Sequence, residues 1–250
     1  MGQAAVAGDA GPEFELCFFE GRGAERRERP ALWPGLQPEL FLPAREFRWS
    51  RRQGHFPGWW WLATTGRHVG YESWLERDHL MLLDFDPAVT AVASQPFWLH
   101  WHDGRRSRRH VPDFFARLAD GTGVVVDVRA DDRIEPVDKE AFEATRSACE
   151  LAGWGFRRVG VPDPVQVANV AWLARYRHLR CGSPDLARLL LKAFAEPAPL
   201  MAGAGLAGDP LAVLPVLFHL IWRHVLVADL AVRLTAETLV SAGPAPGGAW

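Results

Sequence analysis

Two aspartates separated by thirteen residues carry the strongest chemical signal in the sequence. Asp113 follows a proline, and Asp127 stands near the end of a valine-rich run that closes with Val128 and Arg129. Side chains alternate along a strand, so Asp127 and Arg129 point to the same face. If the two strands pair, both carboxylates converge, and the Val128 carbonyl is a candidate third ligand. Such hard oxygen donors suit Mg²⁺, with Mn²⁺ as a substitute.

A divalent ion held in this way would serve phosphodiester hydrolysis. It polarises the phosphoryl oxygen, helps to ionise the attacking water and stabilises the leaving oxygen. Arg129 would stabilise developing charge beside the ion, but its permanently protonated guanidinium is a poor general base. Structural interpretations stay open as well, because Asp113 can cap a turn and Arg129 can form a salt bridge to either aspartate.

A basic loop precedes the first aspartate, between Gly104 and His110. Its cations are Arg105, Arg106, Arg108 and Arg109. A phosphate backbone would run past this loop if the neighbouring site cuts nucleic acid. A solvated hairpin tip has the same composition, so both interpretations stay open.

The elements that must position these residues alternate between strands and helices. The pattern predicts a strand pair at 59–69, a helix at 71–83, strands at 89–101, 110–118 and 123–128, a helix at 137–152, a strand at 155–161 and a helix at 165–177. The second strand region is broken at Gln95-Pro96. This order predicts an α/β core with a mixed sheet.

The pattern changes after Cys181. A helix is predicted at 185–196, and Asp209-Pro210 is a good start for a second one. Short extended segments follow near 225–232 and 238–240, which gives the outline of a small winged-helix-like module. We therefore expect an N-terminal arm at 1–55, a catalytic domain at 56–180, the winged-helix-like module at 181–240 and a flexible tail at 241–250.

Composition limits the possible classes of protein. The formal charge is only −2, so any nucleic-acid footprint must be local. The cysteines Cys17, Cys149 and Cys181 are far apart, which argues against a disulfide framework or a zinc ribbon and fits a reducing compartment. The longest apolar run, at 211–230, contains charged residues and histidines and is a poor membrane span. We expect a cytoplasmic protein with no membrane partner.

Further motifs stand upstream of the two aspartates in a fixed order. They are Tyr71 to Glu76 with its S-x-x-E spacing, Leu80 to Pro87, and Ser94-Gln95-Pro96. Together with P-D and D-x-R, this set resembles the N-terminal catalytic domain of TnsA, the endonuclease subunit of Tn7-type heteromeric transposases. That domain belongs to the restriction-endonuclease-like PD-(D/E)XK superfamily, and the resemblance covers roughly residues 56–180.

The resemblance implies a mixed-sheet core flanked by helices, and it assigns roles to residues. Glu76 takes the position of the family's helical glutamate, while Asp113 and Asp127 take its two strand positions. Arg129 stands where the family has lysine, which keeps the charge but removes the proton-transfer option. Lys139, on the following helix, is a candidate for the missing amine and for DNA contact.

The implied function is metal-dependent hydrolysis of DNA at transposon ends. Double-stranded DNA would be the substrate, and an integrase-like transposase subunit and an AAA+ ATPase regulator would be the partners. Two alternatives stay open. One is a stand-alone restriction-like or repair nuclease of the same fold. The other is a catalytically silent adaptor that binds DNA or the ATPase. This alternative stays open because position 129 is arginine where the family has lysine.

Overall fold

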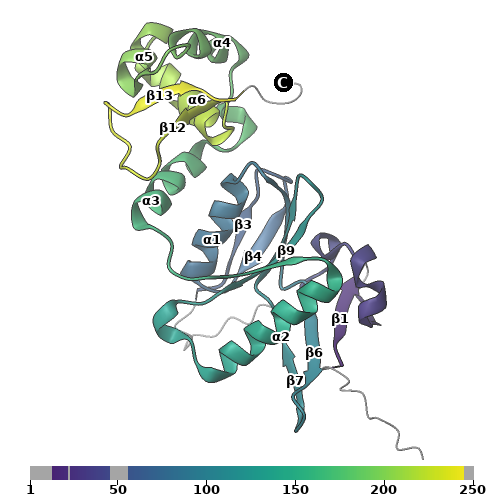
Figure 1. The fold of residues 1–250 in the computed structure, drawn as a ribbon. Coiled ribbons are helices and arrows are strands. Elements are labelled where there is room, and N and C mark those ends of the chain that lie inside the picture. The colour runs from purple at the N-terminus through teal and green to yellow at the C-terminus, as the bar shows by residue number, and fades with distance from the viewer. Residues whose placement is uncertain (1–12, 22, 46–55, 245–250) are drawn as a thin grey trace, which may run out of the picture. The chain divides into compact units, whose positions relative to one another are not determined.

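The computed structural model describes residues 13–21, 23–45 and 56–244, which form two compact units. The first unit combines the chain up to Arg48 with Ala91–Val159, and the second combines Trp49–Thr90 with the chain from Gly160 onward (Figure 1). Each unit is therefore built from two separate stretches of sequence. Parts of the predicted arm (1–12, 22 and 46–55) and tail (245–250) lie outside the described residues.

Two four-stranded sheets organise the first part of the fold. One is antiparallel, in the order β2 (Ala24–Glu28), β1 (Glu15–Glu20), β6 (Trp98–His102) and β7 (Ser107–His110). The other runs β10 (Gly155–Val159), β9 (Gly123–Val128), β8 (Phe114–Leu118) and β5 (Val89–Ser94). In it β10 is parallel to β9 and β8 is antiparallel to β9, so this sheet is mixed, as the sequence predicts.

One helix, α2 (Pro136–Ala152), covers a face of the mixed sheet (Figure 1). It begins with Pro136 at its first position and a capping box, and it ends at Gly153 in the left-handed conformation. Ala144 and Ala148 on this helix share one buried cluster with Phe115 of β8 and Val125 of β9. The cluster also takes in aromatic and aliphatic side chains from the N-terminal residues, namely Phe14, Leu16, Phe18, Trp33 and Phe41.

The described residues of the second unit form a hairpin, five α-helices and a small sheet, besides short 3-10 turns. The hairpin is β3 (Gly58–Trp61) with β4 (His68–Tyr71), and the helices are α1 (Trp74–Phe85), α3 (Pro164–Leu173), α4 (Pro184–Ala193), α5 (Leu200–Ala207) and α6 (Pro210–Trp222). The sheet is antiparallel, in the order β11 (Ala198–Pro199), β13 (Leu239–Ala242) and β12 (Leu226–Ala228). Met81 of α1 shares a buried cluster with Leu190, Phe194 and Leu217 from the later helices.

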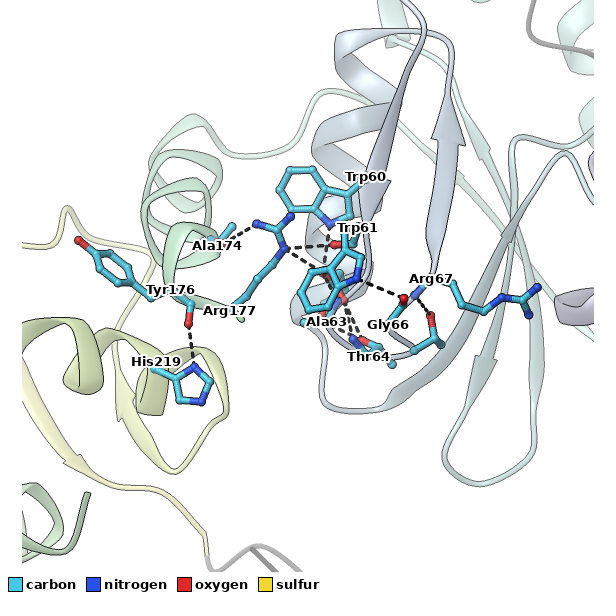
Figure 2. Close-up of polar contacts among 12 residues, drawn as sticks. Trp60, Trp61, Ala63, Thr64, Gly66, Arg67, Ala174, Tyr176, Arg177 and His219 are labelled. Atoms are coloured by element: carbon cyan, nitrogen blue, oxygen red, sulfur yellow. Dashed lines mark hydrogen bonds and ion pairs between the residues drawn. The ribbon is translucent and has the colours of Figure 1, made fainter. Parts of the chain in front are cut away.

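A buried carboxylate ties the hairpin to α1 in this unit. Asp84 accepts hydrogen bonds from the Trp60 indole at 3.0 Å, from the Thr64 backbone at 3.0 Å and from the Thr64 hydroxyl at 2.9 Å. The Arg177 guanidinium lies over the Trp60 ring and donates to the Trp61 carbonyl at 3.1 Å (Figure 2). Burial lowers the pKa of Arg177, and the nearby Asp84 charge offsets part of that shift. The residues after 160 are thereby joined to the hairpin.

Most predicted elements are present, with differences that have local causes. The strand predicted at 110–118 is interrupted at Val111 to Asp113, where Pro112 cannot donate to the sheet, so it divides into β7 and β8. The helix predicted at 165–177 ends at Leu173 and continues as a short 3-10 turn at Ala174–Tyr176. Helix α5 was not predicted.

The region after residue 181 contains three helices and the three-stranded sheet, and its winged-helix-like character remains a prediction. The domain limits predicted at 55, 180 and 240 do not coincide with the two compact units, and as functional divisions they also remain predictions. Among the described residues, no single helix has the length and apolar composition to cross a membrane. Helices α5 and α6 meet that test only as a pair, bent by 118°.

Candidate active site

Asp127 lies on β9 of the mixed sheet, and Asp113 directly precedes the neighbouring strand β8. Phe114 of β8 pairs with Val126 of β9, so the same antiparallel register, continued by one residue, sets Asp113 opposite Asp127. Asp113 is partly exposed, and its Oδ2 accepts a hydrogen bond from the Val128 backbone N–H at 2.7 Å. The convergence expected from strand pairing is therefore present at the level of the backbone register.

Asp127 is almost fully enclosed, at 2% exposure. It follows Val125 on the face of β9 that α2 covers, by the alternation of the strand. A carboxylate at this depth needs a partner, and Nε2 of His110 lies 3.0 Å from both of its oxygens. Burial raises the pKa of the Cys149 thiol to about 12, and the Asp127 charge adds to that rise.

His110 was not among the site residues predicted from the sequence. It ends β7 in the antiparallel sheet, so its contact with Asp127 links the two sheets of the first unit. In the sequence, His110 stands at the end of the basic loop. The available signal was its place in His-Val-Pro-Asp, three residues before Asp113.

Arg129, at the lysine position of the resembling family, binds a third carboxylate. Its Nε and Nη2 lie 3.1 and 2.9 Å from Oδ2 of Asp138 on α2. The same Asp138 oxygen accepts the Glu135 backbone N–H at 2.9 Å and so helps to cap the helix. Arg129 therefore forms its salt bridge with Asp138, whereas the sequence pattern suggested Asp113 or Asp127 as the partner. The Arg129 side chain stays 43% exposed, and a catalytic role for it remains a prediction.

Glu76 lies in the second unit, whereas both aspartates lie in the first. Ser73 is the N-cap of α1, and its hydroxyl accepts the Glu76 N–H at 3.1 Å. The Glu76 carboxylate accepts the Ser73 hydroxyl at 2.8 Å and the Glu72 N–H at 2.7 Å, so it holds the chain at the start of α1. The structure therefore gives Glu76 a structural role at the start of α1, and its role at the catalytic centre remains a prediction.

The basic loop lies between β6 and β7, and its arginines differ in their contacts. Arg108 binds Asp103 at 2.6 Å and Glu140 of α2 at 3.0 Å. The N–H groups of the loop and the Arg108 guanidinium hold the pKa of Asp103 well below its usual range. Arg105 and Arg106 are exposed, and Arg109 is exposed with its guanidinium 4.5 Å from the centre of the Trp98 ring.

Of the five cations predicted to contact DNA, four are exposed and so accessible to a phosphate backbone. They are Arg105, Arg106, Arg109 and, on α2, Lys139. Arg108 is instead engaged with two carboxylates of the hairpin and α2. Contact with DNA remains a prediction for all five residues.

The aspartate pair fits a hard divalent ion in its chemistry but does not form a complete protein cage. Mg²⁺ is often bound by only one or two carboxylates, with water and phosphate oxygens filling the other positions. Asp113 and Asp127 would provide such a pair, and metal binding by them remains a prediction. Within the described ranges, no three or more His, Cys, Asp or Glu side chains are grouped to hold a metal ion.

The mixed sheet with a helix on one face is consistent with a restriction-endonuclease-like fold. Residues 86–159 match the family model described as TnsA-like endonuclease N terminal. This matched segment runs through both aspartates, His110 and Arg129, and it stops short of Glu76. Over this segment, the match supports the resemblance drawn from the ordered motifs. No curated protein matches the chain.

Proposed function

We propose that this chain is the metal-dependent endonuclease subunit of a Tn7-like transposase, which hydrolyses phosphodiester bonds at transposon ends. The observation that carries the proposal is the opposed pair Asp113 and Asp127 inside the segment that matches the TnsA-like endonuclease family. Its substrate would be double-stranded DNA. Its partners would be an integrase-like transposase subunit and an AAA+ ATPase regulator, with a cytoplasmic location.

In this proposal the aspartates hold the ion, and further oxygen donors are the Val128 carbonyl and Glu76. A bound Mg²⁺ or Mn²⁺ would activate water and stabilise charge on the scissile phosphate. The Val128 N–H fixes the Asp113 carboxylate by the 2.7 Å hydrogen bond, so one ligand is oriented before the ion arrives. Nε2 of His110, 3.0 Å from both oxygens of Asp127, holds the second carboxylate in place.

The positive charges have separate roles in the proposal. Arg129 would stabilise charge on the phosphate while its bidentate contact with Asp138 limits its movement. Arg105, Arg106 and Arg109 would contact the DNA backbone, with Lys139 as a further contact from α2. Contacts of this kind position a duplex without reading its sequence.

Nicking of a supercoiled plasmid tests the proposal directly. Wild-type protein is compared with Asp113→Asn and Asp127→Asn in Mg²⁺ and in Mn²⁺, with and without the two partner proteins. The matched control is Asp120→Asn, which changes a carboxylate in the exposed β8–β9 turn. We expect both site variants to lose nicking by about two orders of magnitude or more, and the control to keep it.

The pattern of activity separates the alternatives. Cleavage that needs the partners supports a transposase subunit, whereas equal cleavage without them supports a stand-alone nuclease. Absence of wild-type cleavage under every condition, with DNA binding retained, would replace the nuclease proposal with the adaptor.

A further inference from the structure

A buried glutamine, Gln95, is hydrogen-bonded through its backbone to Asp113, while its side chain has no hydrogen-bond partner among the described residues. Gln95 is 1% exposed, and neither its side-chain oxygen nor its side-chain nitrogen has a partner among the described residues. A carboxamide in this state has lost its hydrogen bonds to water without replacing them, which is unfavourable. Such a group in a folded protein calls for a specific explanation, and one explanation is a ligand that is not yet bound.

The backbone of Gln95 is strained as well. Its φ is 49°, in the left-handed region that a glycine adopts at much lower cost. Two hydrogen bonds hold it there: its N–H donates to the Asp113 carbonyl at 2.9 Å, and its carbonyl accepts the Ala44 N–H at 2.7 Å. The chain therefore keeps a glutamine where its backbone conformation favours glycine, which indicates that the side chain itself is needed.

These features coincide beside the proposed metal ligands. The Gln95 backbone is hydrogen-bonded to Asp113, and the Asp113 carboxylate is hydrogen-bonded to Val128. The incomplete ligand set leaves places that water would fill around a bound ion. A carboxamide can donate to one oxygen and accept from another group, which suits a water molecule held by a cation.

We propose that Gln95 is a positioning residue of the nuclease site, and that its carboxamide hydrogen-bonds a water of the hydrated divalent ion held by Asp113 and Asp127. The inference rests on the proposed function, since it requires the ion. A role for the Gln95 side chain at the metal site would account both for its unpaired carboxamide and for its left-handed backbone. The hydrogen-bond partner that the carboxamide lacks among the described residues would be supplied together with the ion.

Gln95→Met is the main test, because methionine has a similar length and shape without the polar atoms. Without metal, we expect the melting temperature to stay the same or rise, since an unpaired buried polar group has been removed. Affinity for Mn²⁺, measured from the loss of the free-ion signal in electron paramagnetic resonance, should fall about tenfold, with a comparable loss of plasmid nicking. Gln166→Met, at an exposed glutamine of α3, is the matched control and should change none of the three.

Gln95→Gly distinguishes the effect of the side chain from the effect of the strained backbone. It relieves the left-handed conformation but removes the carboxamide, so we expect the same loss of Mn²⁺ affinity as in Gln95→Met. If the methionine variant unfolds, the glycine variant decides the question. Unchanged Mn²⁺ affinity in a folded variant at position 95, beside a wild type that binds and nicks, would overturn the inference and leave the proposed function intact.

The opposite failure is distinguishable. A wild type that binds Mn²⁺ but never nicks DNA would remove the nuclease function, while weaker Mn²⁺ binding by the Gln95 variants would still support the positioning role. A wild type that neither binds Mn²⁺ nor nicks DNA would overturn both.

Discussion

At the scale of single residues, the site depends on the contact between the buried Asp127 carboxylate and His110. Asp127 is enclosed on the α2 side of the sheet, and His110 contacts both of its oxygens. Removing one member of such a pair leaves the other without its partner, which costs more than the pair itself contributes. The two residues should therefore behave as one energetic unit.

A double-mutant cycle tests this coupling through the free energy of unfolding in urea. His110→Leu alone should destabilise the protein by about 1–3 kcal/mol, because Asp127 then lacks its partner. In an Asp127→Asn background the same change should cost less, which gives a coupling energy of about 0.5–3 kcal/mol. Additive effects of the two substitutions would show that the contact contributes little.

The arginine at the lysine position can be tested by changing charge and shape separately. Arg129→Lys keeps the charge and loses the bidentate contact with Asp138, which is partly exposed and should cost no more than about 1 kcal/mol. We expect this variant to retain nicking, whereas Arg129→Met should lose it by about tenfold or more. Wild-type nicking by the methionine variant would reduce Arg129 to a partner of Asp138.

At the scale of elements, the second unit depends on a polar contact below its surface. Asp84 accepts hydrogen bonds from Trp60 and Thr64 of the hairpin. Arg177, from the chain after 160, donates to the Trp61 carbonyl of the same hairpin (Figure 2). Asp84→Asn would replace one carboxylate oxygen by an NH2 group, which would face the N–H and O–H donors of Trp60 and Thr64. We expect a loss of about 2–4 kcal/mol in the free energy of unfolding, against little change in Asp86→Asn at the end of α1. Equal stability of the two variants would contradict this assignment.

The buried histidines of the second unit predict a pH dependence of stability. Burial lowers the pKa of His219 and of His79 in the folded state. The unfolded chain therefore binds protons more readily, and stability should fall as pH drops below the unfolded histidine pKa of about 6.5. His219→Gln should make the decline between pH 7 and pH 5 shallower in urea titrations. An unchanged slope would show that His219 does not contribute.

The elements show what the sequence can and cannot predict. Strand β9 and helix α2 follow from alternation, caps and a terminal glycine, which are all local signals. Helix α5 was missed because Gly203 and Gly205 disfavour a helix. A side chain at Gly203 would overlap the Phe194 ring, so tertiary packing selects glycine there. The register that opposes Asp113 and Asp127 was predictable, whereas the His110 and Asp138 contacts depend on other elements.

At the scale of the whole molecule, each compact unit uses two stretches of chain, so the units do not follow the contiguous limits predicted from the sequence, which remain predictions as functional divisions. The predicted catalytic domain, 56–180, lacks Phe14, Leu16, Phe18 and Trp33, which belong to the buried cluster under α2. It also lacks the helices that share a core with Met81 of α1. Pattern along the chain reveals elements, but it does not reveal which distant elements share a core.

A fragment spanning residues 56–180 should therefore not fold by itself. We expect poor dispersion of its amide signals in a two-dimensional NMR spectrum and no cooperative unfolding, whereas the full chain should show both. The matched control is a chain shortened only by residues 1–12, which lie outside the described ranges. A well-dispersed spectrum from the 56–180 fragment would contradict the interleaved core.

Interleaving also has a topological consequence. The chain passes from one unit to the other three times, after Arg48, after Thr90 and after Val159. One cut backbone bond at any of these crossings leaves two covalent links, so no single proteolytic event can release either unit. Because two covalent links remain after one proteolytic cut, the two units stay together in a one-to-one ratio. The unit that carries Glu76 and the unit that carries the aspartate pair therefore remain parts of one molecule.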